Sequence, residues 1–165
     1  ADAKYKRYIG NGAPKHFLSW SNNLTWRNFD LSVFFRGTFG FDVFNMRKYG
    51  MGLQGCGTDN VLRSAYLEDK NIRTGGGVIS SYFLEDGSFI KLENVTLGYN
   101  FTPKNRKLLD NMRIYLSAKN LFTLTGYSGN DPSIIDVNGI QPGVDSNSAY
   151  PTATQLSLGV TLRFK

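Results

Sequence analysis

The last twelve residues, 154–165, read TQLSLGVTLRFK and alternate strictly between two kinds of side chain. The even-numbered positions from Leu156 to Phe164 are apolar, and the odd-numbered positions from Gln155 to Arg163 are polar or glycine. Because successive side chains of a strand point to opposite faces, this period of two predicts a strand with one apolar and one polar face. The apolar face must meet either a protein core or a lipid bilayer.

Four further segments alternate in the same way, and together they predict five strands of about ten residues. The five predicted strands are residues 16–26, 29–39, 89–101, 112–124 and 154–164. Such strands are long for a soluble domain, but they match the length with which a tilted strand crosses a bilayer. We therefore read the segments as candidate membrane strands.

The links between these segments alternate in length. Residues 27–28 and 102–111 are short links, whereas 40–88 and 125–153 are long. Short periplasmic turns and long extracellular loops are typical of a transmembrane antiparallel β-barrel, whereas a fifty-residue irregular loop is unusual in a soluble domain. We expect an all-β chain that contributes five strands to such a barrel.

Composition narrows the class of protein. The 165 residues carry a formal charge of +6, but the lysines and arginines are scattered, so we expect no nucleic-acid partner. The single cysteine, Cys56, excludes an intrachain disulfide. No apolar run approaches the roughly 20 residues of a membrane helix. No signal peptide is visible, and the opening ADAKYKRYIGNG reads as the interior of a longer chain, so we expect a fragment.

The polar positions of the predicted strands hold several cations. By parity, four of them point into the barrel interior, where they would line a substrate path or pair with carboxylates: Arg36, Arg113, Lys119 and Arg163. Lys91 and Glu93 share the apolar parity of their strand, and charges there are costly in lipid. We expect these two side chains above the membrane plane, on an exposed ribbon.

Four blocks of the sequence resemble one family when taken in order. They read IGNGAPKHFLSWSNNLTWRNFDLSVFFRGTFGFDVFN (9–45), YFLEDGSFIKLENVTLGYNF (82–101), IYLSAKNLFTLTGYSGNDP (114–132) and PGVDSNSAYPTATQLSLGVTLRFK (142–165). They are similar to the C-terminal end of SusC/RagA-type TonB-dependent outer-membrane transporters. The resemblance implies a barrel of about 22 strands with a plugged lumen, of which this chain supplies the last five. The plug domain and the earlier strands are absent from the sequence.

The resemblance also implies a function and partners. These are import of glycans or peptides across the bacterial outer membrane, a SusD-like surface lipoprotein on the extracellular side, TonB acting through the missing plug, and the surrounding lipid bilayer. It further implies that the C-terminal strand carries an insertion signal, made of Leu158, Val160, Leu162 and Phe164.

The long links contain six aromatic residues that could contact a substrate or a partner: Tyr49, Tyr66, Tyr82, Phe83, Tyr127 and Tyr150. Such rings stack on sugars or pack against a protein surface, and they equally pack loops against one another. Both interpretations stay open at this point.

No constellation of residues supports catalysis. His16 and Cys56 are each the only residue of their type, and they lie forty positions apart, so we expect no enzyme. Asp131, Asp136 and Asn138 offer oxygen ligands in a loop, but their spacing differs from the known calcium loop. We expect no cofactor, with calcium as a minor alternative. The alternative function is a secreted β-sandwich that binds carbohydrate, which explains the alternation but not the pattern of links.

Overall fold

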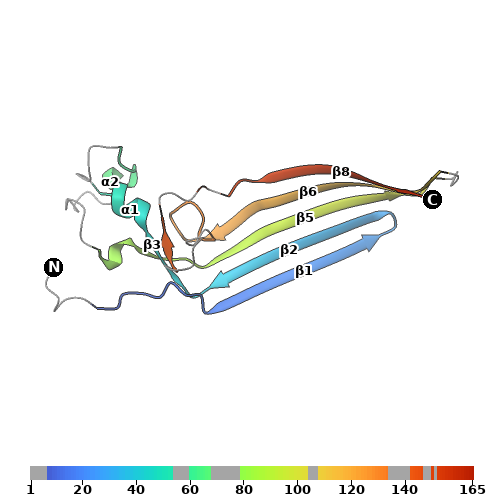
Figure 1. Ribbon diagram of the computed structural model, residues 1–165. Helices are drawn as coiled ribbons and strands as arrows, with labels where there is room; N and C mark the ends of the chain where they lie inside the picture. The colour runs from blue at the N-terminus through green and yellow to red at the C-terminus, as the bar shows by residue number, and fades with distance from the viewer. Residues whose placement is uncertain are drawn as a thin grey trace. The chain divides into compact units, whose positions relative to one another are not determined.

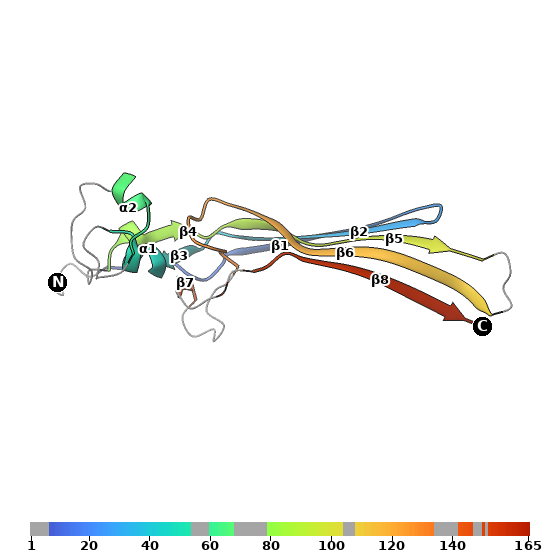
Figure 2. The ribbon, with the colours of Figure 1, turned by 90° about the horizontal axis from the view of Figure 1, so that it is seen from above.

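Five long strands form one sheet. In the computed structural model, the described residues are 7–53, 60–67, 79–103, 108–133, 142–146, 150 and 152–165. The strands of this sheet are β1 (His16–Trp26), β2 (Phe29–Phe39), β5 (Phe89–Phe101), β6 (Leu109–Thr125) and β8 (Gln155–Phe164). Their spatial order is β1-β2-β5-β6-β8, so strands that follow one another along the chain lie side by side (Figures 1 and 2).

Pairing between β6 and β8 keeps the two kinds of side chain on separate faces. Leu116 lies opposite Leu158 and Ile114 opposite Val160, whereas the intervening Ser117 lies opposite Ser157. Leu116 is 51% exposed and Leu158 is 75% exposed. The alternation in β6 and β8 therefore gives this pair of strands one apolar face, and Leu116 and Leu158 on that face are uncovered in this chain.

Two backbone positions shape the long strands. Arg27 has a φ of 53° in the two-residue turn between β1 and β2, and its guanidinium stacks on the Trp26 ring at 5.1 Å. Asn120 has a φ of 52° within β6, where asparagine tolerates the left-handed region. β6 runs through Asn120 and is longer than the predicted segment, 112–124.

The long links contain secondary structure that the sequence patterns did not predict. A three-stranded sheet has the order β4-β3-β7, with β3 (Asp42–Asn45) antiparallel to β4 (Leu84–Asp86) and parallel to β7 (Val144–Asp145). The helices are α1 (Met46–Met51), α2 (Ser64–Leu67) and the 3₁₀ turn η2 (Ser81–Phe83). None of the helices in the described parts of the chain is long and apolar enough to cross a membrane.

The chain divides into two compact units, each with its own contacts. The sheet unit comprises Phe17–Gly37, Ile90–Leu124 and Thr152–Lys165, and the loop unit comprises Ala1–His16, Thr38–Phe89 and Thr125–Pro151. The buried apolar side chains of the loop unit form two clusters. One contains Phe41, Val43, Phe89 and Tyr127, and the other contains Leu53 and Phe83.

The expectation that Lys91 lies on an exposed ribbon was wrong. Its side chain is only 2% exposed, and its ammonium donates to Thr152 Oγ1 at 3.2 Å. Glu93 accepts a hydrogen bond from Arg36 Nε at 3.1 Å. The Lys91 side chain is therefore covered, because Thr152, in the chain that leads into β8, lies against it.

Candidate functional site

The polar face of the long sheet holds a bidentate ion pair. Arg113 of β6 donates from Nε to Asp30 Oδ1 at 3.1 Å and from Nη2 to Asp30 Oδ2 at 2.5 Å. Asn100 of β5 donates to the same Asp30 Oδ1 at 2.8 Å. Paired N–H donors on one carboxylate give both strength and a fixed geometry. These contacts tie three neighbouring strands together on one face.

A glycine makes room for this pair. β5 lies between the strands of Asp30 and Arg113, and a Cβ at Gly98 of β5 would lie 2.5 Å from Asp30 Oδ1 and 2.7 Å from Arg113 Nε. The β6–β8 pair has a similar arrangement, since a Cβ at Gly159 of β8 would overlap the ring of Tyr115 of β6. Glycine within a strand often marks such a close approach.

The alternation is interrupted between the two ion pairs of the sheet. Asp30 and Arg36 are both even-numbered residues of β2, yet their partners in β5, Asn100 and Glu93, have opposite parity. Regular strands place alternate residues on opposite faces, so the alternation cannot be continuous along both strands between these pairs.

Two of the four predicted lumen cations are thus paired. Arg113 binds Asp30 and Arg36 binds Glu93, whereas Lys119 lies opposite Gln155 and Arg163 lies opposite Asn111 at exposed positions of the β6–β8 pair. That these side chains face a barrel lumen stays a prediction. The predicted insertion signal also stays a prediction, although Leu158, Val160, Leu162 and Phe164 are all exposed and alternate along β8.

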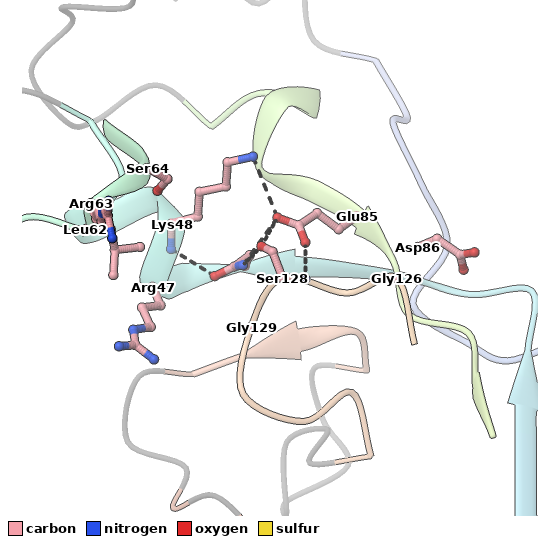
Figure 3. A pocket seen from close by; sticks show the side chains of 11 residues that line it. Arg47, Lys48, Leu62, Arg63, Ser64, Glu85, Asp86, Gly126, Ser128 and Gly129 are labelled. Carbon is pink, nitrogen blue, oxygen red and sulfur yellow. Dashed lines mark hydrogen bonds and ion pairs between the residues drawn. The ribbon is translucent and has the colours of Figure 1, made fainter. Parts of the chain in front are cut away.

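The loop unit contains a pocket with a volume of about 640 Å³. Its walls come from α1, α2, β4 and the chain after β6, and they carry Arg47, Lys48, Arg63, Glu85 and Ser128 (Figure 3). α1 is held at its start by Asn45, whose side chain accepts from the backbone N–H of Lys48 at 2.8 Å. This cap fixes the two cations that follow Asn45 at the pocket wall.

Glu85 is the centre of the hydrogen bonds in this pocket. Ser128 donates to it twice, from its backbone N–H and from its hydroxyl, both at 2.8 Å. Asn45 Nδ2 donates at 3.3 Å, and Lys48 Nζ forms an ion pair at 3.7 Å. Figure 3 shows Lys48 reaching toward Glu85 while the Arg47 side chain points away from them.

Five of the six predicted contact aromatics fall into two groups, one packed and one exposed. Tyr49 and Tyr82 each pack against Phe83, with ring centroids 5.2 Å and 5.1 Å away, and Phe83 is buried. Tyr66 and Tyr150 are exposed, the latter at 86%. Substrate or partner contact stays a prediction for this set, and Tyr66 and Tyr150 are its exposed rings.

Tyr127, the sixth of these aromatics, is buried in the cluster with Phe41, Val43 and Phe89. Its hydroxyl donates to Asp145 Oδ2 at 2.6 Å. Burial raises the pKa of Tyr127 above its ordinary value, and the hydrogen bond to Asp145 raises this pKa further. Tyr127 thus holds β7 to the chain after β6 as a neutral phenol.

The candidate metal and catalytic residues do not come together where the chain is described. Within that part, no three His, Cys, Asp or Glu residues are close enough to hold a metal ion. Asp131 accepts from Ser133 within its own turn. Asp136, Asn138 and Cys56 lie outside the described residues. His16 is exposed at the start of β1.

Sequence reasoning missed most of the residues that organise these two regions. Asp30, Gly98 and the Glu85–Ser128 contact were not singled out. Gly98 carried a usable signal, because a glycine on the polar parity of a long strand indicates close approach of other side chains. Glu85 carried none, since its partners come from segments far apart in the chain.

Comparison with known proteins shows which receptors the chain is similar to. No family model matches the chain. TonB-dependent receptor P3 of Formosa agariphila is 26% identical over 180 residues, which covers 96% of this chain and 17% of that receptor. TonB-dependent receptor SusC of Bacteroides thetaiotaomicron is 28% identical over 156 residues, covering 89% of this chain and 15% of SusC. This chain is homologous to SusC/RagA-type TonB-dependent receptors.

A solved structure shows the same fold. The RagAB peptide importer in its closed-closed state superposes with a TM-score of 0.77 at 24% identity, covering 98% of this chain and 19% of the importer chain. This chain therefore spans about a sixth of the length of the SusC/RagA-type receptors that it matches. The curated relatives are TonB-dependent receptors, and the solved neighbour is a peptide importer.

Proposed function

We propose that the chain is a membrane-spanning part of an outer-membrane, TonB-dependent importer of the SusC/RagA type. In this proposal the long strands are the last five of a transmembrane barrel, and the loop unit lies on the extracellular side. The observation that carries it is the register of β6 and β8, which sets Leu116 against Leu158 on an uncovered apolar face. Such a face requires an apolar medium, and lipid provides one.

The remainder of the machinery belongs to the proposal as well. The two edge strands, β1 and β8, would pair with other strands of the same barrel, because a long unpaired strand edge invites aggregation. The transporter would open through a plug driven by TonB and work with a SusD-like surface lipoprotein. Its substrates would be glycans or peptides, and the similarity to a peptide importer supports the second class.

A test of this function uses the complete receptor in its host. Cells in which the coding region for this segment is deleted should lose growth on the nutrient that the receptor imports. The same loss should follow removal of TonB from cells with the intact receptor. Growth that is independent of both would contradict the proposal.

A second test uses the isolated segment. The 165 residues without their neighbours should need detergent to stay dispersed, because the apolar face and both sheet edges are uncovered. A soluble monomer that melts cooperatively without detergent would contradict a membrane role and favour a secreted binding module.

A further inference from the structure

We propose that the pocket of the loop unit binds the carboxylate groups of an acidic peptide through Arg47 and Arg63. This inference rests on the proposed function, because it names the class of substrate that the extracellular side of the importer would take.

The acidic side chains of the pocket are satisfied from within. Glu85 accepts from Ser128 and Asn45 and pairs with Lys48. Asp86 accepts from the backbone N–H of Ser88 at 2.9 Å and from its hydroxyl at 2.7 Å. Because a carboxylate is stabilised by such donors, neither residue needs a cationic ligand.

The two arginines are in the opposite situation. Asn130 Oδ1 accepts from Arg47 Nη1 at 2.7 Å, which fixes the guanidinium but uses only one of its N–H donors. Arg63 has no side-chain hydrogen bond or ion pair among the described residues, and it is exposed at the pocket wall. Among the described lining residues, the charged donors that are left are therefore guanidinium groups, whose planar fork matches a carboxylate.

The lining favours a peptide over a sugar. Sugar rings present an apolar C–H face that packs on aromatic rings, and none of the described residues that line the pocket is aromatic. The nearby ring of Tyr82 is occupied, since the Lys48 ammonium lies 4.4 Å from its centroid. Gly126 and Gly129 instead offer backbone groups at the wall, with which an extended peptide can form hydrogen bonds.

The size of the pocket agrees with a short ligand. A volume of about 640 Å³ lies within the range of small-molecule sites. The pocket would hold a few residues of a peptide, with a glutamate, an aspartate or the terminal carboxylate at either arginine.

The experiment measures peptide binding to the complete receptor in detergent by fluorescence anisotropy. The probes are a labelled pentapeptide containing two glutamates and the same peptide with glutamines and an amidated terminus. We expect the acidic peptide to bind more tightly, and Arg63→Gln and Arg47→Gln each to weaken its binding about tenfold. Neither substitution should change binding of the glutamine peptide.

The matched control is Arg7→Gln, which removes the same charge from an exposed residue of the loop unit that does not line the pocket. Equal binding of the two peptides would overturn the inference, as would an Arg7→Gln effect as large as that of Arg63→Gln. Preference for an acidic oligosaccharide over the acidic peptide would also overturn it. The growth experiment with TonB removed tests the proposed transport function separately. If growth depends on TonB but the receptor binds the acidic and the glutamine peptide equally, this inference fails and the proposed function stands.

Discussion

Arg113 and Asp30 form a two-point ion pair across a strand that belongs to neither of them, directly above Gly98. The pair joins β2 to β6 over β5, and Asn100 adds a third contact from β5 itself. Because Gly98 has no side chain, Asp30 and Arg113 can form an ion pair across β5. We therefore expect the Asp30–Arg113 ion pair to depend on Gly98 as well as on the two charged residues.

Gly98→Val should separate the ion pair, because the new side chain would occupy the space of Asp30 Oδ1 and Arg113 Nε. We expect a loss of about 1–3 kcal/mol in the free energy of unfolding of the complete receptor, measured by urea titration in detergent. Gly126→Val is the control, since a Cβ at Gly126 meets nothing within 4 Å. If the two variants unfold alike, Gly98 is not needed to make room for the pair.

The two ion pairs of the sheet should differ in strength. Asp30 and Arg113 share two hydrogen bonds, whereas Arg36 and Glu93 share one at 3.1 Å and are more exposed. We expect a double-mutant cycle with alanine to give a coupling of about 1–2 kcal/mol for the first pair and below about 1 kcal/mol for the second. The reverse order would show that the bidentate geometry does not set the strength.

Leu158→Arg should impair insertion of the receptor into the membrane. Leu158 lies on the proposed lipid face opposite Leu116, and a charge near the middle of the bilayer costs about 2–4 kcal/mol. Ser157→Arg introduces the same charge on the other face of β8 and should be tolerated. Folding efficiency into lipid vesicles measures both. Failure of the Ser157 variant with normal insertion of the Leu158 variant would mean that the two faces are exchanged.

Tyr127→Phe should destabilise the loop unit by about 1–2 kcal/mol, because it removes the buried hydroxyl that donates to Asp145. The raised pKa of Tyr127 means that the folded chain keeps a proton that the unfolded chain begins to lose near pH 10. The stabilisation is therefore complete below about pH 10 and declines above it.

Urea titrations of the receptor at about pH 7 and about pH 11 measure this difference. The alkaline loss of stability should be smaller in Tyr127→Phe than in the wild type. Tyr150→Phe, which alters an exposed ring, should leave both the stability and its pH dependence unchanged. An equal alkaline loss in the wild type and in Tyr127→Phe would exclude this tyrosine as the source.

The long strands could be predicted because their period of two extends over ten or more residues. β3, β4 and β7 have only four, three and two residues, which is too short for a period to be recognised. The Lys91 environment could not be predicted, because the residue that it contacts, Thr152, is 61 positions away. The pocket depends in the same way on contacts between distant segments, such as Asn45 with Ser128.

The most direct test of the central claim is the accessibility of spin labels at two adjacent positions of β8 in the complete receptor. Cys56→Ser removes the native thiol, and Leu158→Cys and Ser157→Cys then each carry a nitroxide in a lipid bilayer. The label at position 158 should collide with dissolved oxygen more than with a water-soluble nickel complex, and the label at position 157 should show the reverse preference. A water-accessible label at position 158 would contradict the proposal that this face of the sheet meets lipid.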